Sequence, residues 1–211
     1  MNALQVGRSR FSRIFWSILG ETVRVPDLQQ LVEGQQRFRV GADYNTGSLS
    51  TKDAEDLYTL VRFFQPAVIA EVGTFIGVST RTMALAAPQA AIYTCDISNA
   101  LQGALDGLAN IKYYPKSSSS EMFRQLVASN LSVDLLYLDG RLSEEDFDPL
   151  LKLVHDNTVF VFDDFEGVEK GVVNAMMLEG PGRILVYPKE GRKTAVSLPS
   201  TLFQIVRQEF V

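Results

Sequence analysis

From about residue 52 onward, short apolar runs alternate with segments in which apolar residues recur at helical spacing. The runs are typical of buried strands, which are apolar on both faces. The expected strands are VIAEVG, AIYTCDI, IKYY, VDLLYLDG and TVFVFDDF, and the expected helices are TKDAEDLYTLVRFF, STRTMALAA, NALQGALDGLAN, residues 121–129, EEDFDPLLKLVHD and GVEKGVVNAMMLE. Strands that alternate with helices form right-handed crossover units, so the pattern predicts a mostly parallel sheet with helices on both faces.

Two more apolar runs, RILVYP and TAVSLP, follow near the end of the chain, joined by the turn-rich KEGRK. Such a pair predicts a β-hairpin, which would add an antiparallel edge to the sheet. The expected fold class is therefore α/β, with a doubly wound, mostly parallel, Rossmann-like sheet of seven strands that ends in an antiparallel hairpin.

Residues 1–45 do not share this alternation. In RFSRIFWSILG, one helical face carries Phe11, Ile14, Phe15, Ile18 and Leu19. We expect an N-terminal helical segment over residues 1–45, which acts as a lid or a dimer contact, and one catalytic or binding domain over residues 46–211. A helix that lies on a membrane surface is the alternative for the N-terminal segment.

Composition limits the classes of function. The chain has 211 residues, a net charge of −5 and one cysteine. A negative net charge argues against general nucleic-acid binding, which basic patches usually drive. A single cysteine, Cys95, excludes a disulfide framework and a zinc site built from cysteines. No apolar run has the length of a membrane span and no signal peptide is evident, so we expect a cytoplasmic protein.

The loop after the first expected strand, in EVGTFIGVST, is the first candidate site. In an open parallel sheet, ligands bind beyond the carboxyl ends of the strands, where this loop lies. Gly73 would let the chain turn tightly, and Gly77 would let the backbone approach a ligand. Ser79 opens a helix whose free N–H groups favour an anion. A dinucleotide fingerprint that began at Gly73 would need two further glycines, where the chain has Phe75 and Val78.

The loop therefore suits a cofactor whose anionic end is smaller than a pyrophosphate, such as the carboxylate of an amino acid. Glu71 would be a partner for an ammonium group. Asp96 ends the next expected strand, and an acid there can accept hydrogen bonds from both hydroxyls of a ribose. An amino acid at the first loop and a ribose at the second strand together correspond to S-adenosylmethionine.

With these residues the sequence resembles the class I S-adenosylmethionine-dependent methyltransferases, and among them the metal-dependent catechol-type O-methyltransferases and related small bacterial O-methyltransferases. The resemblance runs from about Ser50 to Pro199. It implies cofactor contacts from TGSLS, from the glycine loop, from the ends of the second and fourth strands, and from KSSSSE. The implied cofactor-binding residues are Gly47, Ser48, Glu71, Gly73, Thr74, Gly77, Ser79, Asp96, Ser118, Ser119 and Asp139.

The fourth and fifth expected strands end in acids, namely Asp139, Asp163 and Asp164. Because the carboxyl ends of parallel strands share one edge, these carboxylates would gather beside the methyl group of the cofactor. They would repel one another strongly, so either some stay protonated or a cation neutralises them. Oxygen ligands favour Mg²⁺, or Mn²⁺ or Ca²⁺, and the resemblance implies the same three metal ligands. In the alternative interpretation, one of Asp163 and Asp164 caps the next helix and the other is solvated.

The resemblance leaves the general base open. Catechol-type enzymes carry a lysine three residues after the first metal aspartate, where this chain has Leu142, and related bacterial enzymes have DGDH where it has DGRL. The only histidine, His155, is expected late in a helix at the opposite edge of the sheet. The candidate catalytic residues are Asp139 and Lys170, which lies just past the metal acids where the next helix begins and is the nearest candidate base in the sequence; otherwise the metal alone acidifies the substrate. Arg141 would suit an anionic group of the substrate.

The expected function is methyl transfer from S-adenosylmethionine to a hydroxyl of a small catechol, vicinal-diol or sugar-like acceptor, with Mg²⁺ or a similar divalent cation. The expected partners are a small-molecule substrate and a second copy of the chain, bound through the N-terminal helix or the last hairpin. Two alternatives stay open. A non-catalytic S-adenosylmethionine-binding module would explain the missing lysine and histidine, and a nucleotide-dependent oxidoreductase is disfavoured by Phe75 and Val78.

Overall fold

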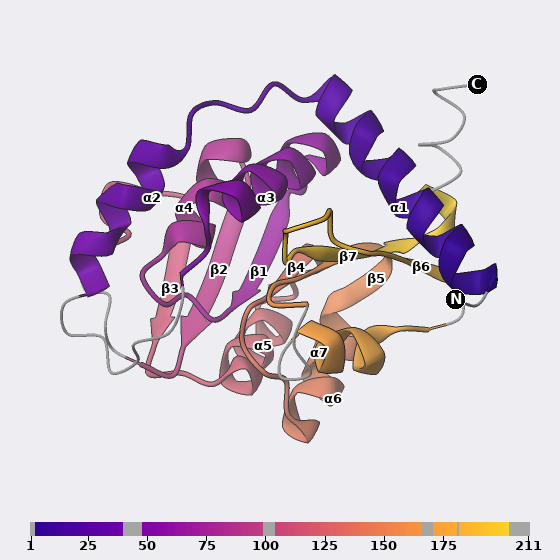
Figure 1. Cartoon of the computed structure of the whole chain (residues 1–211). Coiled ribbons are helices and arrows are strands. Elements are labelled where there is room, and N and C mark those ends of the chain that lie inside the picture. The colour runs from indigo at the N-terminus through magenta and orange to yellow at the C-terminus, as the bar shows by residue number, and fades with distance from the viewer. Residues whose placement is uncertain (1–2, 40–47, 99–103, 166–170, 181, 203–211) are drawn as a thin grey trace.

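The computed structural model describes residues 3–39, 48–98, 104–165, 171–180 and 182–202. Within these ranges, one seven-stranded sheet has the order β3-β2-β1-β4-β5-β7-β6 (Figure 1). The strands are β1 (Val68–Val72), β2 (Ala91–Asp96), β3 (Ile111–Pro115), β4 (Val133–Leu138), β5 (Val154–Phe162), β6 (Arg183–Val186) and β7 (Ala195–Pro199). Strand β7 runs antiparallel to β5 and β6, and the other neighbours are parallel. The predicted fold class is confirmed.

Helices cover both faces of this sheet. They are α1 (Ala3–Thr22), α2 (Gln29–Gln35) with the 3-10 helix η1 (Gln36–Arg39), α3 (Thr51–Phe64), α4 (Val78–Ala86), α5 (Ser119–Ala128), α6 (Glu144–Leu153) and α7 (Gly171–Leu178). One buried cluster joins α1–α4 to strand residues such as Ile69 and Tyr137, and the other joins α5–α7 to residues such as Ala70 and Leu136. Because neighbouring residues of a strand point to opposite faces, each face has its own core.

Local signals fix where several helices begin and end. Ser50 caps α3 by accepting a hydrogen bond from the backbone N–H of Asp53, and Gln65 ends that helix in a left-handed conformation just before Pro66. A reciprocal capping box between Ser118 and Glu121 starts α5.

Two secondary-structure predictions are wrong. The described part of the helix expected over residues 99–110 forms turns, and Gly107 there has a φ of +84°. The helix expected over residues 144–156 ends at Leu153, because Val154 already pairs with Val133 and begins β5. His155 therefore lies at the start of a strand, at the edge of the sheet opposite the acids.

The N-terminal helices pack on the sheet domain within the described residues. Phe15 and Leu19 of α1 and Val32 of α2 belong to the same buried cluster as α3 and α4. Trp16 donates a hydrogen bond from Nε1 to the backbone oxygen of Tyr187, at 2.9 Å, beyond the end of β6. The division into residues 1–45 and 46–211, and the lid or dimer role, stay predictions, and residues 40–45 lie outside the described residues. Across the described chain, no helix is both long and apolar enough to span a membrane.

Candidate cofactor and metal site

The carboxyl ends of four neighbouring strands bring the predicted residues into one row. The last paired residues of β1, β4 and β5 are in register with one another and with β2. Backbone hydrogen bonds continue that register by one residue. The N–H of Gly73 donates to the carbonyl oxygen of Cys95, the N–H of Asp139 to that of Val72, and the N–H of Asp163 to that of Leu138. The row across the edge of the sheet reads Asp96, Gly73, Asp139 and Asp163.

Gly73 is required by a close contact between two loops. Its φ is +96°, and a Cβ there would lie 2.9 Å from the backbone nitrogen of Gly140. The loop after β1 therefore lies directly against the loop after β4, which carries Asp139. This contact joins the expected cofactor loop to the acid cluster.

A glycine is required at position 77 for a different reason from the one we expected. Its φ is +74°, but a Cβ there would meet the side chain of Leu105 at 2.8 Å and that of Gln35 at 3.3 Å. Neighbouring side chains, rather than an open approach for a ligand, occupy this side of the residue. Gly77 also leaves the start of α4 without a side-chain cap. The first N–H groups of that helix therefore donate to no capping side chain, which is the arrangement that binds anions.

Glu71 is fully buried beneath the first turn of α4. Its carboxylate accepts hydrogen bonds from Ser79 Oγ and from Thr80 Oγ1, the latter at 2.6 Å. Burial raises the pKa of Glu71 to about 7, against the lowering effect of these hydroxyls. Glu71 is fully buried and its hydrogen-bond partners lie inside the fold, so its pairing with an ammonium group stays a prediction. Its contacts tie β1 to the start of α4.

Asp96 lies half-buried at the mouth of the same loop. Its two carboxylate oxygens accept hydrogen bonds from the backbone N–H of Phe75 at 2.7 Å and of Ser98 at 2.8 Å. A carboxylate has about four acceptor positions, so Asp96 can still accept from a ligand. Thr74 is buried and its hydroxyl lies 2.6 Å from that of Thr94, so this contact ties the loop after β1 to β2.

Among the remaining cofactor candidates, the structure brings the segment of Ser118 and Ser119 to this mouth. The segment before α5 approaches the end of β2, because the N–H of Ser117 donates to the backbone oxygen of Asp96 at 3.1 Å. Ser118 caps α5 with its side chain, and Ser119 is buried. Ser48 is half-buried just before α3. Gly47 and Lys170 lie outside the described residues.

Gln35 of α2 is a residue that sequence reasoning missed. Its side chain is buried and donates from Nε2 to the backbone oxygens of Ile76 at 2.8 Å and of Ala104 at 3.1 Å. It thus holds the cofactor loop and the loop after β2 from the N-terminal segment. No local pattern could have signalled it, since its partners are far away in the sequence.

The three predicted acids come together at the carboxyl edge. Asp139, Asp163 and Asp164 each offer one carboxylate oxygen, and these atoms all lie within 4.8 Å of one another. Asp163 is buried, and its Oδ1 has no hydrogen-bond partner among the described residues. Burial, followed by repulsion from Asp139 and Asp164, raises the pKa of Asp163 well above its ordinary value. A buried, unpaired carboxylate oxygen within an acid cluster fits a divalent cation with oxygen ligands.

Two hydroxyls beside the cluster are also unpaired. Tyr137 lies two residues before Asp139 on β4, is fully buried, and has no hydrogen-bond partner for its hydroxyl among the described residues. Thr194 immediately precedes β7, where the antiparallel pairing of β5 and β7 brings it beside Asp163, and its hydroxyl is likewise unpaired there. Buried hydroxyls of this kind have hydrogen-bond partners in most proteins. The unpaired hydroxyls of Tyr137 and Thr194 could therefore bind waters of an ion held by the acids.

Lys193 is the second functional candidate that sequence reasoning missed. Its Nζ lies 3.1 Å from Asp164 Oδ1, and that hydrogen bond raises the pKa of Lys193 above its ordinary value. It comes from the hairpin that joins β6 and β7. Only the pairing of β7 with β5 brings that hairpin to the acids, and the sequence does not reveal it.

The loop after β4 is fixed by α7 and has no lysine. Asn174 is buried and donates to the backbone oxygen of Gly140 at 2.8 Å, while it accepts from the N–H of Leu142 at 3.3 Å. Leu142 itself is buried in the core on that face. His155 pairs with Asp134 at 3.1 Å, and Asp134 also accepts from the N–H of Val68 at the amino end of β1. His155 is therefore not part of this site.

Comparison with known proteins agrees with this geometry. Residues 70–165 match the family model of a methyltransferase domain. The O-methyltransferase TomG from Streptomyces achromogenes, involved in tomaymycin synthesis and solved in complex with SAM, is 19% identical with a TM-score of 0.64, over 94% of this chain and 99% of TomG. A comparison with curated proteins finds no match.

Two other solved structures are similar. The SAH-bound methyltransferase PaMTH1 from Podospora anserina is 15% identical, with a TM-score of 0.64 over 94% of this chain and 97% of that one. The O-methyltransferase from Bacillus cereus, in complex with SAH, is 14% identical, with a TM-score of 0.60 over 90% of this chain and 98% of that one. The predicted resemblance is confirmed: the matched family model and the similar solved structures are methyltransferases, and the chain has the fold of those structures.

Proposed function

We propose that the protein is an S-adenosylmethionine-dependent O-methyltransferase that works with Mg²⁺ or a similar divalent cation. Its acceptor would be a hydroxyl of a small catechol, vicinal-diol or sugar-like molecule. The observation that carries the proposal is the buried, unpaired Oδ1 of Asp163 inside the three-acid cluster, directly beside the glycine loop. Two of the similar structures are O-methyltransferases solved with SAM or SAH, which supports O-methylation.

The cofactor would lie across the ends of β1, β2 and β4. The uncapped start of α4 after Gly77 would receive the carboxylate of the methionine part. Asp96 would accept hydrogen bonds from the ribose, for which it retains acceptor positions. The segment of Ser118 and Ser119 would border the adenine, and Gly47 and Ser48 would border the cofactor from the other side. In this assignment Glu71, Thr74 and Ser79 hold the loop in shape, and Gly73 lets it lie against the loop of Asp139.

Asp139, Asp163 and Asp164 would hold the ion. When bound, such an ion lowers the pKa of a coordinated hydroxyl, so that the oxygen becomes a better nucleophile. The chain contributes position: the register of β1, β4 and β5 sets the acids next to the cofactor loop. Alignment of the acceptor oxygen with the methyl group is the main source of rate in such a site. The base assigned to Lys170 stays a prediction.

The alternatives differ in what supports them. A non-catalytic S-adenosylmethionine-binding module is favoured by Leu142, which is buried where catechol-type enzymes carry a lysine. A nucleotide-dependent oxidoreductase is opposed by Val78, which packs in the core where a dinucleotide loop needs glycine. The homodimer and the cytoplasmic location stay predictions.

Titration calorimetry with S-adenosylmethionine tests the cofactor part. We expect saturable binding by the wild type and at least about tenfold weaker binding by Asp96→Ala, since two ribose hydrogen bonds to a charged group are lost. Asp156→Asn, which removes an exposed acid at the other edge of the sheet, is the matched control and should bind like the wild type. No heat from the wild type at millimolar cofactor would refute the proposal.

Methylation of a catechol and sugar panel, with and without chelator, tests the metal part. Activity that disappears with chelator and returns with Mg²⁺ is the expected result. Full activity in excess chelator would move the protein to a metal-independent mechanism, and cofactor binding without turnover on any acceptor would favour the non-catalytic module.

A further inference from the structure

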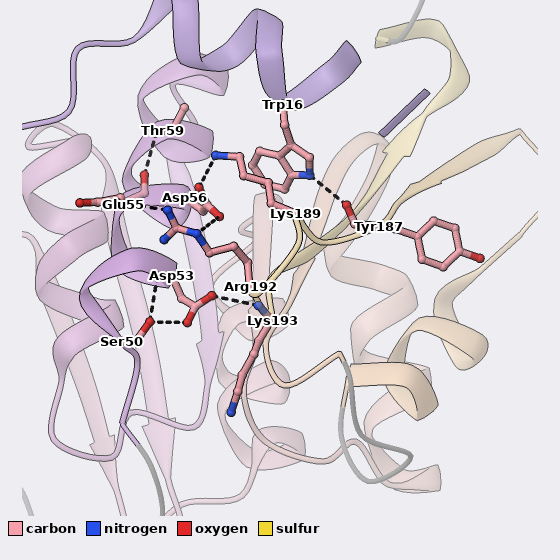
Figure 2. A network of polar contacts seen from close by, with 10 residues as sticks. All are labelled: Trp16, Ser50, Asp53, Glu55, Asp56, Thr59, Tyr187, Lys189, Arg192 and Lys193. Atoms are coloured by element: carbon pink, nitrogen blue, oxygen red, sulfur yellow. Dashed lines mark hydrogen bonds and ion pairs between the residues drawn. The ribbon is translucent and has the colours of Figure 1, made fainter. Parts of the chain in front are cut away.

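The loop that joins β6 to β7 carries three cationic side chains, Lys189, Arg192 and Lys193, and two of them form ion pairs with acids of α3 (Figure 2). Lys189 Nζ lies 2.5 Å from Asp56 Oδ1 and 4.8 Å from the centre of the Trp16 ring. Arg192 Nη2 lies 3.4 Å from Glu55 Oε2. These two cations anchor the hairpin to the helices that cover the sheet.

Lys193 is held differently, through its backbone. Its N–H donates to Asp53 Oδ1 at 2.9 Å, and its carbonyl oxygen accepts from the N–H of Phe165 at 3.0 Å. Asp53 is buried and is itself fixed by the hydroxyl of Ser50, 2.5 Å from Asp53 Oδ2. Both backbone groups of Lys193 are therefore fixed, one by the first turn of α3 and one by the residue that follows Asp164.

This anchoring leaves the side chain of Lys193 free to extend away from the Asp56 network, as Figure 2 shows. It reaches Asp164 instead, where its ammonium hydrogen-bonds to Oδ1 at 3.1 Å. Asp164 is one of the three acids whose carboxylate oxygens converge within 4.8 Å. A lysine ammonium and a divalent ion would therefore share one acid of the same cluster.

We propose that Lys193 is a tethered cation that competes with the divalent ion for Asp164 and so weakens metal binding at this site. The inference rests on the proposed metal site. Its basis is geometric: the backbone of Lys193 cannot move away without breaking two hydrogen bonds, so the ammonium stays within the length of its side chain from a point fixed beside the acids. An ion held by Asp164 would either replace the ammonium at Oδ1 or bind the other oxygen, and in both cases the ammonium would remain nearby as a like charge.

The size of the effect follows from charge and exposure. A unit charge about 5 Å from a divalent ion would change its binding by far more than tenfold in a low-dielectric interior. The side chains of Lys193 and Asp164 are 53% and 37% exposed, so solvent screens much of this repulsion. We therefore expect removal of the ammonium to tighten metal binding by about tenfold or more.

Calorimetric titration with Mn²⁺ and Mg²⁺, with no acceptor present, tests the competition. Lys193→Met removes the charge and keeps the backbone contacts, and Lys193→Gln is measured in parallel as a polar, uncharged substitute. Lys193→Arg keeps the charge and should retain wild-type affinity. Lys152→Met is the matched control, because it removes an exposed lysine from α6 and should leave the affinity unchanged. Thermal melting of each variant monitors folding.

The outcomes separate this inference from the proposed function. Tighter binding by the Met and Gln variants, with wild-type affinity in the Arg variant, supports the competition. Equal affinities in all variants would overturn it and leave the metal site in place, and so would weaker binding by the Met and Gln variants. If neither the wild type nor the variants bind either ion, the metal part of the proposed function fails and the competition fails with it, while S-adenosylmethionine binding is still measurable.

Discussion

Replacing Glu71 by glutamine removes a carboxyl group that is fully buried between β1 and the first turn of α4. Burial raises the pKa of Glu71 from 4.5 to about 7. Since the folded protein holds this proton more tightly than the unfolded chain, Glu71 makes stability fall as the pH rises from about 4.5 to about 7. Above that window the folded state carries the full cost of a buried carboxylate.

The cost can be worked out from the two pKa values. A tenfold change in proton affinity corresponds to about 1.4 kcal/mol, so ionised Glu71 lowers the free energy of unfolding by about 3 kcal/mol at pH 8 and by about 1 kcal/mol at pH 5. Glutamine has nearly the same shape and does not ionise, and the hydroxyls of Ser79 and Thr80 can rotate to suit it. Glu71→Gln should therefore gain about 2 kcal/mol more stability at pH 8 than at pH 5.

Urea denaturation of the wild type and Glu71→Gln at both pH values measures this difference directly. Glu179→Gln, at an exposed position after α7, is the control and should show no pH-dependent gain. A change in stability that is equal at the two pH values would refute the reasoning, because it would mean that Glu71 ionises in the folded protein as readily as in the unfolded chain.

Three further substitutions test other contacts of the site. Gly73→Ala should lower the free energy of unfolding by about 2 kcal/mol or more in urea denaturation, because its Cβ would lie 2.9 Å from Gly140 N at a φ of +96°; Gly107→Ala, at a φ of +84° with open space around the Cβ, is the control and should cost less. Gln35→Leu should weaken S-adenosylmethionine binding about tenfold in calorimetry, because the two carbonyls it holds lose their donor; unchanged affinity would exclude Gln35 from positioning the loop. Asp163→Asn should abolish Mn²⁺ binding and spare S-adenosylmethionine binding, and undiminished Mn²⁺ affinity would remove Asp163 from the metal site.

The sequence predicted the fold and the edge where the candidates meet because both follow from local patterns. Strand-length apolar runs that end in Glu71–Gly73, Asp96, Asp139 and Asp163 put these residues at carboxyl ends, and parallel strands share that edge. The register then aligns them without any further information. What the sequence could not predict is the direction of each side chain. Glu71 points into the core, since the hydroxyls of α4 capture it.

The contributions of Gln35 and Lys193 were missed for a related reason. Each reaches the site across a long separation in the chain, from an element whose own pattern indicates only a helix or a hairpin. Buried polar contacts of this kind leave no periodicity and no spacing in the sequence. They could be found only once the order of strands placed β7 beside β5 and the N-terminal helices beside α4.

The position of Lys193 bears on the lysine that is missing after Asp139. In catechol-type enzymes that lysine comes from the loop after the fourth strand, but here Asn174 holds that loop and Leu142 turns into the core. A lysine at position 142 would bury an ammonium in apolar surroundings, which costs free energy unless it is paired. The hairpin supplies an ammonium to the same cluster from the opposite side, at Asp164. Leu142→Lys in the Lys193→Met background should therefore lower stability without restoring a cation at the acids, and recovery of wild-type metal affinity in that double variant would contradict this view.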